Sequence, residues 1–486
     1  MKKLIEIIKN IEIKEKLNFK PDIMIKGITE NSKEVKKDYL FFARKGLTFN
    51  GEEYIEEAIS KGANVIIRET PSDNRYPDVV QIQVNDIKNA ISQVGFNFYD
   101  TPQKNLILIG ITGTNGKTSV SYFIKTILDL FGKKTGYIGT LFYETDRIIP
   151  SKETTPGILK ILSLLKEMNE KHFYACVTEV SSHALDQDRL LGLKFDICAF
   201  TNLSQDHLDY HKTIENYYQS KKKLFTKYTK SSGSIVISLE TKHGYRLAKE
   251  LENKNLILVN GGDIKTEILD RKNGLFLKIS IKDKTYKVKT QILGDYQAKN
   301  IATTLGVLLA LGYKEDEIIE KLKYLKNPIG RLEVVGRKQG APIIVDYAHT
   351  PEALKEVLKS LRPLVKNKLI ITFGCGGNRD RGKRPLMGRI ASLFADEIVL
   401  TSDNPRYEDP LKIIEEIKQG LNGSKPYYVI PDRREAIRFS IEKLKKGDVL
   451  LIAGKGHETY QEIQGIRYPF SDQEEILKIL TELGEK

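Results

Sequence analysis

The sequence is poor in cysteine and contains no long hydrophobic run. Its three cysteines, Cys176, Cys198 and Cys375, occur singly among 486 residues and without C-x-x-C spacing, which excludes a disulfide framework or a cysteine-based zinc site. We expect them to be small buried hydrophobic side chains. No stretch of eighteen or more uncharged apolar residues is present, so we expect no membrane insertion.

The N-terminus has the lysines of a signal peptide but lacks its other features. Its lysines precede the apolar residues, but Glu6 and Lys9 interrupt the apolar stretch and no small-residue cleavage site follows. The spacing instead predicts an amphipathic helix whose apolar face is formed by Leu4, Ile7, Ile8 and Ile11. We therefore expect a cytoplasmic protein.

The positive charge is not concentrated in a basic tail, and neither a repeat nor a low-complexity segment is present. Lys and Arg total 78 against 64 Asp and Glu, which gives a formal net charge of +14 spread through the chain. Nucleic-acid binding is one explanation, and attraction of polyanionic small substrates is another. The charge alone does not choose between them.

The chain is long enough for about three domains, and all three are predicted to be α/β. Residues 1–101 alternate short strands and helices. Residues 102–329 repeat a pattern of strand, polar loop and helix, and the pattern begins again in residues 330–486. The strongest predicted strands are Tyr39–Ala43, Asn64–Ile67, Leu106–Ile111, Phe173–Val180, Phe195–Phe200, Ile343–Val345, Leu369–Phe373, Glu397–Leu400 and Val449–Ile452.

A glycine-rich loop follows the predicted strand Leu106–Ile111 and precedes a predicted helix. The stretch GITGTNGKTS supplies two flexible glycines, Gly113 and Gly116, a cation and a hydroxyl group able to bind a metal ion. It departs from the strict phosphate-loop pattern because Ile111 stands where a glycine is required. Its position between a strand and a helix nevertheless predicts nucleotide binding.

Two polar motifs follow the next predicted strands, at the edge of the sheet where this loop lies. TEVSSHALDQDR places Glu179 at a strand end, and TNLSQDHLDYH contains His207. Magnesium prefers oxygen ligands, which Glu179 and Thr118 provide, whereas histidine is an unusual ligand for it. From the residues alone, Glu179 could also be a helix cap and His207 could equally be structural.

Together these motifs resemble those of the Mur ligase family, the cytoplasmic amide-bond ligases of peptidoglycan synthesis. SKETTPGIL, YYQSKKKLF, GDYQAKN, GRLEVV and DYAHTP also match motifs of the family. The resemblance covers nearly the whole chain. It implies a uridine-binding N-terminal domain, a central phosphate-loop domain with a mostly parallel sheet and flanking helices, and a Rossmann-like C-terminal domain.

The resemblance also implies the residues that serve ATP and the metal. The catalytic residues would be Lys117, Glu179, His207 and Lys221. Lys221 would be carbamylated and would hold Mg²⁺ together with Thr118, Glu179 and His207. The ATP site would comprise Gly113, Thr114, Asn115, Gly116, Lys117, Thr118, Ser119, Asn300, Arg331 and Asp346. Gln297 stands where the adenine-contacting motif has its first asparagine, as in the related folate-polyglutamate ligases.

The substrate side of the resemblance comes from the first two segments. The motifs SKETTPGIL and TEVSSHALDQDR, with Ser32 in the matching N-terminal stretch, imply a site for a UDP-sugar-peptide. Its residues would be Glu30, Ser32, Thr154, Thr155, Ser181, Gln187 and Arg189.

Three motifs of the last segment, FGCGGNRDRGKRPLMG, SDNPRYEDP and AGKGHETY, resemble the members that add the third residue of the stem peptide. They imply an amino-acid site formed by Arg379, Asp403, Asn404, Pro405, Arg406, Gly454 and Glu458. The planar fork of Arg406 suits a carboxylate, which meso-diaminopimelate carries at its far end and lysine does not. Glu458 would pair with the distal ammonium. The alternative for Arg406 is a surface arginine in a proline turn.

The resulting hypothesis is an ATP-dependent ligase, working as a monomer, that joins meso-diaminopimelate to UDP-MurNAc-L-Ala-D-Glu through an acyl phosphate. His183 is a candidate base for the amine. Lanthionine, which has the same head groups, or L-lysine remains an alternative substrate, and a folate-polyglutamate ligase remains an alternative enzyme. A phosphate-loop protein that binds nucleic acid is the alternative from another class; our hypothesis expects no nucleic-acid partner.

Overall fold

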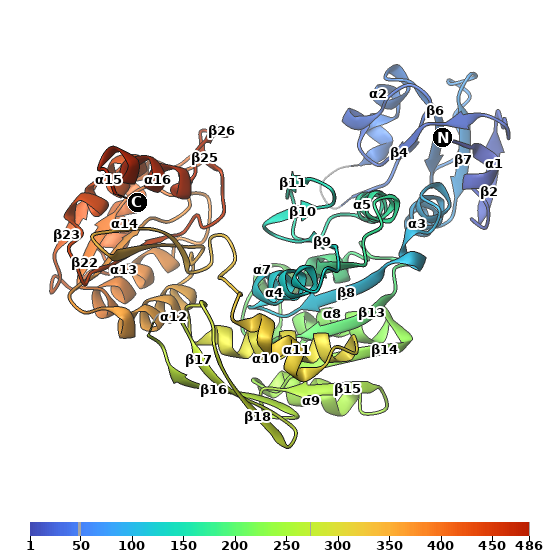
Figure 1. Cartoon of the computed structure of the whole chain (residues 1–486). Helices are drawn as coiled ribbons and strands as arrows, with labels where there is room; N and C mark the ends of the chain where they lie inside the picture. Colours follow the sequence, from blue (N-terminus) through green and yellow to red (C-terminus); the bar gives the residue numbers. More distant parts are fainter. Residues whose placement is uncertain (47–49, 273, 486) are drawn as a thin grey trace. The chain divides into compact units, whose positions relative to one another are not determined.

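The structure is a computed structural model that describes residues 1–46, 50–272 and 274–485. The chain forms two compact units (Figure 1). The first comprises Met1–Lys117 and Leu128–Ile257, and the second comprises Thr118–Ile127 and Leu258–Lys486. Within the described ranges, no helix has the length and apolar character needed to cross a bilayer.

The N-terminal part of the first unit is built on a five-stranded sheet with the order β2-β7-β6-β5-β4. All its pairs are parallel except β2 with β7. Phe41 and Ile66 are buried against apolar residues of α2. The elements are β1 (Lys2–Lys3), α1 (Leu4–Ile7), β2 (Ile13–Leu17), β3 (Met24–Ile25), β4 (Gly27–Thr29), β5 (Tyr39–Phe42), α2 (Ile55–Ser60), β6 (Ala63–Arg68), β7 (Val80–Val84) and α3 (Ile87–Phe98).

The rest of the first unit carries a second sheet with the strand order β11-β10-β9-β12-β8-β13-β14-β15. Strand β8 lies between β12 and β13, and both pairs are parallel. The elements are β8 (Ile107–Thr112), β9 (Thr135–Ile138), β10 (Phe142–Glu144), β11 (Ile148–Pro150), α5 (Ile158–Glu170), β12 (Ala175–Glu179), α6 (Ser182–Asp186), β13 (Phe195–Phe200), α7 (Leu208–His211), α8 (Ile214–Thr226), β14 (Thr229–Ser238), α9 (Lys242–Glu250) and β15 (Asn255–Val259).

The register of this sheet positions the candidate site. Glu179 at the end of β12 pairs with Ile111, and Phe200 at the end of β13 pairs with Thr112. The three strands therefore end level with one another, and the polar loops that follow them meet at one edge of the sheet. The convergence predicted from the sequence is confirmed.

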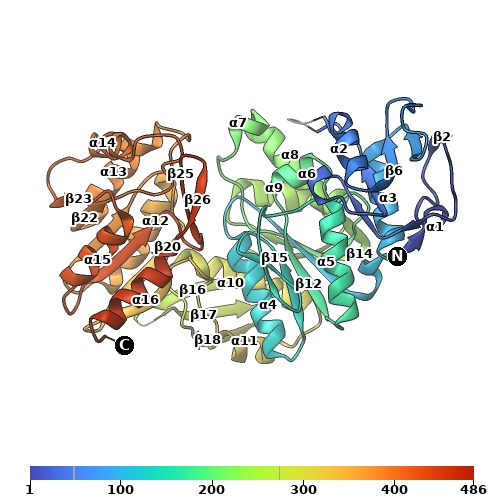
Figure 2. The same ribbon diagram turned by 90° about the horizontal axis from the view of Figure 1, so that it is seen from above.

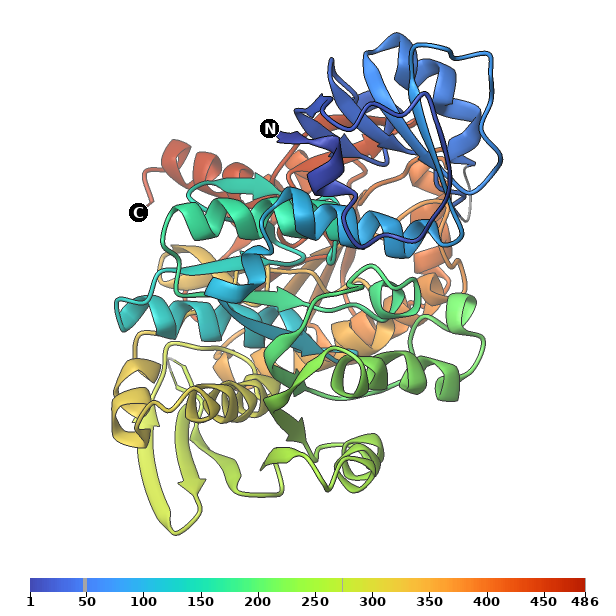
Figure 3. The same cartoon turned by 90° about the vertical axis from the view of Figure 1, so that its right-hand side faces the viewer.

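Helix α3 packs closely on α5 within the first unit (Figure 3). The contact is made at Gly95, where an added Cβ would lie 2.8 Å from Leu159 and 2.9 Å from Leu162. An added methyl group at this position would therefore force the ends of these two leucine side chains to shift.

The second unit begins with an antiparallel arrangement of β16, β17 and β18 and two helices. Helix α4 (Lys117–Leu130), which follows the phosphate loop, contributes residues 118–127 to this unit. The other elements are β16 (Ile264–Asp270), β17 (Phe276–Ile281), β18 (Lys284–Lys289), α10 (Tyr296–Ala310) and α11 (Glu315–Leu322).

The C-terminal part of the second unit is a six-stranded sheet with the order β19-β20-β24-β21-β22-β23, parallel except for β19. Helices α12, α13 and α14 cover one face, and α15 and α16 cover the other (Figure 2). The elements are β19 (Glu333–Lys338), β20 (Ala341–Asp346), α12 (Pro351–Leu361), β21 (Leu369–Phe373), α13 (Lys383–Phe394), β22 (Glu397–Leu400), α14 (Pro410–Lys418), β23 (Tyr427–Val429), α15 (Arg433–Lys443), β24 (Val449–Ala453), β25 (Tyr460–Ile463), β26 (Ile466–Pro469) and α16 (Asp472–Glu482).

The α/β class and the predicted strands are confirmed, with one difference at the N-terminus. The amphipathic helix buries Leu4 and Ile7 as expected but is a single turn, because the chain turns at Asn10 with φ of 66°. The three cysteines are buried and free, and burial raises the pKa of Cys176 to about 12. The domain limits 1–101, 102–329 and 330–486 stay predictions.

Candidate active site

The glycine-rich loop joins β8 to α4 and has a conformation that requires glycine. Gly113 and Gly116 have φ of 154° and 86°, and a Cβ on Gly113 would lie 1.9 Å from Thr201 Oγ1. The Lys117 ammonium donates hydrogen bonds to the carbonyl oxygens of Gly113 and Thr114, both at 2.9 Å. A cation folded against a glycine loop at a helix N-terminus is an arrangement suited to anionic oxygens.

Asn202, from the loop after β13, holds the glycine loop in place. Its carbonyl oxygen accepts the backbone N–H of Thr114 at 2.9 Å, and its side-chain oxygen accepts that of Asn115 at 3.0 Å. The Thr201 hydroxyl donates to the Asn115 carbonyl at 2.6 Å. Residues beyond the glycine loop itself therefore determine its shape.

Lys221 extends from α8 to the same loop. It is 2% exposed, its ammonium donates to the Gly113 carbonyl at 2.7 Å, and it lies 4.6 Å above the Tyr217 ring. Burial, aided by the nearby Lys117 cation, holds the pKa of Lys221 well below its usual value. A larger fraction of this amine is therefore neutral at physiological pH, which is the form that attacks carbon dioxide.

Glu179 is fully buried at the end of β12. Its Oε1 accepts hydrogen bonds from the Tyr137 hydroxyl and from the Thr140 backbone N–H at 3.0 Å, and its Oε2 accepts from the Thr140 hydroxyl at 3.2 Å. Polar donors thus surround this carboxylate, as a buried anion requires.

Three histidines gather beside these groups. The His183 ring lies 4.9 Å from that of His207 and 5.5 Å from that of His211. Burial lowers the pKa of His207; the Asp206 carboxylate opposes this shift, and the Lys117 cation adds to it. Burial and the other two histidines lower the pKa of His183 to about 4. These imidazoles are neutral at pH 7 and able to accept a proton or a metal ion.

Among residues 1–46, 50–272 and 274–485, no group of three or more His, Cys, Asp or Glu side chains is placed to hold a metal ion. The predicted ligand set contains only two such residues, Glu179 and His207, and takes its other oxygens from Thr118 and a carbamate on Lys221. The carboxylate, hydroxyl and carbamate oxygens fit Mg²⁺, so the donor set depends on modification of Lys221.

A cavity of about 740 Å³ lies in the first unit. Glu30, Gln187 and Arg189, three of the residues predicted for the UDP-sugar-peptide, line it. Burial raises the pKa of Glu30, against the effect of Arg44, whose Nε lies 2.6 Å from Glu30 Oε2. The sequence interpretation missed four cations in the lining, Arg44, Lys88, Lys152 and Lys160, although Lys152 lies inside the motif SKETTPGIL.

Four other residues were predicted for that substrate and are not among the cavity-lining residues: Ser32, Thr154, Thr155 and Ser181. The Thr155 hydroxyl donates to the Glu179 carbonyl at 2.7 Å and accepts the Ser181 N–H at 3.0 Å. Thr154 shares a 3.1 Å hydroxyl contact with Thr140. The Ser32 hydroxyl instead donates to Glu57 at 2.5 Å. Thr154, Thr155 and Glu179 therefore form one group, and Ser32 is not among the cavity-lining residues.

In the second unit, a hydrogen-bonded chain joins Asn300, Gln297 and Ser119. Asn300 and Ser119 were predicted for the ATP site, and Gln297 lies in the adenine-contacting motif. Asn300 donates from Nδ2 to Gln297 Oε1 at 2.8 Å, and Gln297 donates from Nε2 to Ser119 Oγ at 3.2 Å. Gln297, which replaces the expected asparagine, thus links α10 to the helix after the phosphate loop.

The two predicted nucleotide residues of the C-terminal segment are also engaged. Both carboxylate oxygens of Asp346 accept backbone N–H groups, from Leu332 and Ala348, at 2.7 Å each. Burial raises the pKa of Asp346, and Arg331 opposes that rise. Arg331 lies 4.7 Å above the Tyr347 ring. Asp346 therefore stabilises the end of β20, whatever ligand it also contacts.

The residues predicted for the amino acid follow β21, β22 and β24, which are neighbours in the sheet. The Arg406 side chain is only 18% exposed; its Nη1 donates to the Gly377 carbonyl at 2.8 Å, and its Nε lies 3.6 Å from Glu462 Oε2. Arg379 is exposed, and both arginines lie near Gly376. Arg406 is therefore not a solvent-facing arginine in a turn. Glu462 was missed because no motif contains it.

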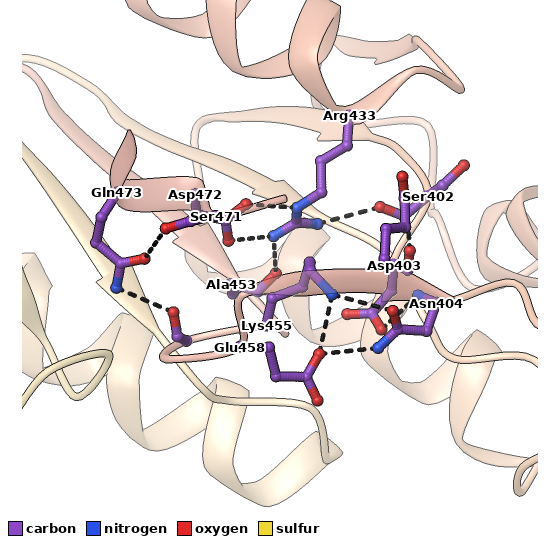
Figure 4. Close-up of polar contacts among 12 residues, drawn as sticks. Ser402, Asp403, Asn404, Arg433, Ala453, Lys455, Glu458, Ser471, Asp472 and Gln473 are labelled. Carbon is purple, nitrogen blue, oxygen red and sulfur yellow. Dashed lines mark hydrogen bonds and ion pairs between the residues drawn. The ribbon is translucent and has the colours of Figure 1, made fainter. Parts of the chain in front are cut away.

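The remaining residues of this group contact one another (Figure 4). Glu458 Oε2 accepts hydrogen bonds from Asn404 Nδ2 at 2.8 Å and from Lys455 Nζ at 2.9 Å. Gly454 has φ of 113°, and a Cβ there would lie 2.6 Å from Asp403 Oδ2. The loops after β22 and β24 thus meet through side chains of both. The sequence interpretation missed Lys455, although it lies inside the motif AGKGHETY.

Comparison with known proteins gives matches along nearly the whole chain. The family profiles described as the Mur ligase family catalytic domain, the Mur ligase middle domain and the Mur ligase glutamate ligase domain match residues 24–99, 111–308 and 330–456. The UDP-N-acetylmuramoyl-L-alanyl-D-glutamate--2,6-diaminopimelate ligase of Aquifex aeolicus is 45% identical over 94% of this chain and 94% of its own length. The protein of the same name from Clostridium tetani is 41% identical over 99% of this chain and 100% of its own length.

A solved structure gives the same result. A UDP-N-acetylmuramoyl-L-alanyl-D-glutamate--2,6-diaminopimelate ligase is 32% identical to this chain, covers 100% of both chains and superposes with a TM-score of 0.69. The chain is therefore similar to these proteins in both sequence and fold over nearly its full length.

Proposed function

The chain belongs to the Mur ligase family, and on this premise we propose that it joins meso-diaminopimelate to UDP-MurNAc-L-Ala-D-Glu, using ATP, in the synthesis of the peptidoglycan precursor. The observation that carries this proposal is 45% identity over 94% of the chain to a diaminopimelate-adding ligase. The presence of Arg406 and Glu458 in the loops after β22 and β24 agrees with it.

The reaction requires activation of an acid, because forming an amide from a carboxylate and an amine in water is unfavourable. The side-chain carboxylate of the D-glutamyl residue attacks the γ-phosphorus of ATP, releasing ADP and forming an acyl phosphate. The diaminopimelate amine then attacks the acyl carbon, loses a proton, and phosphate departs. Two anions approach each other in the first step, and the ammonium of Lys117 at the phosphate loop offsets their repulsion.

Thr118, Glu179, His207 and carbamylated Lys221 would hold Mg²⁺. When bound, the ion neutralises phosphate charge and so assists the attack of the carboxylate. The low pKa of Lys221 supports carbamylation, since only its neutral amine reacts with carbon dioxide. The neutral amine adds carbon dioxide and releases a proton, so an uncharged group becomes an anion next to the phosphate loop.

The cavity of about 740 Å³ in the first unit is the proposed site for the UDP-sugar-peptide. Its five cationic lining residues, Arg44, Lys88, Lys152, Lys160 and Arg189, suit a substrate that carries a diphosphate and carboxylates. The chain Ser119, Gln297 and Asn300, with Arg331 and Asp346, serves the nucleoside of ATP.

The amino acid is proposed to bind at the loops after β21, β22 and β24. Arg406 receives the distal carboxylate of meso-diaminopimelate, and Glu458 receives its distal ammonium. We place the enzyme in the cytoplasm, where ATP and the nucleotide-linked precursor occur, and we expect it to act as a monomer.

Phosphate release and product mass test the proposal together. We expect phosphate release only when ATP, UDP-MurNAc-L-Ala-D-Glu and an amino acid are all present, with formation of the tripeptide product and meso-diaminopimelate preferred over lanthionine and L-lysine. Turnover stimulated by DNA or RNA alone, or by a folate with glutamate, would contradict it.

A further inference from the structure

Two buried cations lie behind the amino-acid site, and neither has a substrate role in the proposed function. Lys455 and Arg433 are 0% and 1% exposed, and each contacts both loops that form the site (Figure 4). Burying a charge is costly unless partners surround it, so the contacts of these two residues indicate their role.

Lys455 contacts the side chains of the site. Its ammonium donates to Asn404 Oδ1 at 3.0 Å and to Glu458 Oε2 at 2.9 Å. Asn404 Oδ1 also accepts the Glu462 backbone N–H at 2.9 Å, while its Nδ2 donates to Glu458 at 2.8 Å. These three side chains therefore form a closed triangle.

The triangle fixes two orientations. The Asn404 amide has its oxygen toward a cation and a backbone donor, and its nitrogen toward a carboxylate, so the reverse orientation would oppose every partner. Glu458 is held through one oxygen, Oε2, by both neighbours. These two contacts, one of them from Lys455, therefore also fix the direction of the other carboxylate oxygen, Oε1.

Arg433 holds the backbones of the same two loops. Its guanidinium forms a bidentate pair with Asp472, with both distances 2.7 Å, and donates to the carbonyls of Ser402 at 3.2 Å and Ala453 at 3.1 Å. Ser402 immediately precedes Asp403, and Ala453 immediately precedes Gly454. Arg433 therefore forms the backbone frame on which the Lys455 triangle rests.

We propose that Lys455 is a positioning residue that sets recognition of the distal ammonium of the amino acid, acting through Glu458 and Asn404. This inference rests on the proposed function and adds to it a residue that itself touches no substrate. Without the Lys455 ammonium, Glu458 loses its cation and Asn404 loses the donor that fixes its amide, so the carboxylate is no longer presented in one direction.

The test compares meso-diaminopimelate with L-2-aminopimelate, which lacks only the distal amine. We expect the wild type to prefer diaminopimelate by about 100-fold or more in kcat/KM, because a site built for a polar group rejects the analogue without it. In Lys455→Met we expect KM for diaminopimelate to rise about tenfold or more and the preference to fall below about fivefold. KM for ATP and for UDP-MurNAc-L-Ala-D-Glu should stay unchanged.

Lys443→Met is the matched control. Lys443 is also a lysine of the C-terminal part of the second unit, pairs with the buried carboxylate Glu397 and contacts the Tyr428 hydroxyl at 2.6 Å. It is not part of the triangle, so the preference for diaminopimelate should persist in this variant. If Lys455→Met does not fold, Lys455→Gln carries the same comparison, since its amide retains donors without the charge.

The outcomes separate the two proposals. A wild type that does not ligate diaminopimelate would overturn the proposed function itself. A wild type that prefers diaminopimelate over 2-aminopimelate, with the same preference in the folded Lys455 variant, would overturn the positioning role alone. Equal loss in the Lys455 and Lys443 variants would also overturn it, since the effect would then be general to the fold.

Discussion

The ammonium nitrogen of Lys221 lies 2.7 Å from the carbonyl oxygen of Gly113, although the two residues are 108 positions apart in the chain. This contact joins α8 to the phosphate loop and buries a lysine where the proposed chemistry needs an anion. The position explains why Lys221, and not its neighbours in the run of three lysines, is suited to carbamylation.

Lys221→Ala should reduce kcat by about 100-fold or more, because the metal loses a proposed ligand and the loop loses a contact. A short carboxylate such as acetate added to this variant should restore part of the activity by replacing the carbamate. Steady-state phosphate release measures both effects. Lys222→Ala is the control: Lys222 pairs with Glu250 at 2.9 Å on the partly exposed side of α8, so its loss should change kcat less than about twofold. Equal loss in the two variants would contradict the assignment.

When Lys221 is not carbamylated, Lys221→Met should raise the free energy of unfolding above that of the wild type. The size of this increase should depend on pH. The pKa of Lys221 is lowered in the folded state, whereas in the unfolded state it has its usual value near 10.5. Between those values unfolding takes up a proton, so the free energy of unfolding of the wild type falls as pH falls, by about 1.4 kcal/mol for each pH unit. The thermal midpoint in carbon dioxide-free buffer should therefore favour the variant more at about pH 7 than at about pH 9.5. If the difference in thermal midpoint between the variant and the wild type did not depend on pH, the pKa of Lys221 would not be lowered in the folded state.

Gly113→Ala should disable the phosphate loop. The added Cβ would lie 1.9 Å from Thr201 Oγ1, and φ of 154° is unfavourable for alanine. We expect ATP affinity to fall about tenfold or more, measured by calorimetric titration. Gly132→Ala is the control, since Gly132 has φ of 72° with nothing within 4 Å of its Cβ, so it should lose about 1 kcal/mol of stability and bind ATP normally. Normal ATP binding by the Gly113 variant would argue against this loop as the nucleotide site.

Arg406→Ala should remove the preference for a substrate with a distal carboxylate. The guanidinium is held by Gly377 and faces Glu462, so it is positioned for one anionic partner. We expect kcat/KM for meso-diaminopimelate to fall about 100-fold or more, while that for L-lysine changes little. The kcat/KM of Arg406→Lys for meso-diaminopimelate should lie between those of the wild type and Arg406→Ala, because an ammonium cannot form the bidentate pair with a carboxylate. A wild type that prefers lysine, with no change in the variant, would refute the pocket.

The predicted glycine loop, the strand ends and the convergence of polar loops are confirmed by the structure. They were readable because each depends on local chemistry: an apolar strand, glycines that permit a tight turn and a helix that follows. The roles of the individual site residues stay predictions, including Mg²⁺ binding by Glu179 and His207.

Other features could not be read from the pattern. Ser32 lies in the expected motif but donates to Glu57, and Asp346 accepts two backbone N–H groups. Glu462 and Arg433 belong to no motif that was interpreted, yet they contact the amino-acid loops. Such contacts depend on which side chains the fold brings together, and spacing along the chain does not encode them directly.

By itself, the sequence determined the α/β class, the family and the order of the motifs, because these follow from local propensity and from residues close in the chain. Only the tertiary structure decided that Lys221 is buried beside Gly113, and that Lys455 and Arg433 connect the loops after β22 and β24. Burial and charge pairing act between residues distant in sequence, and they exist only after the strands and helices have packed.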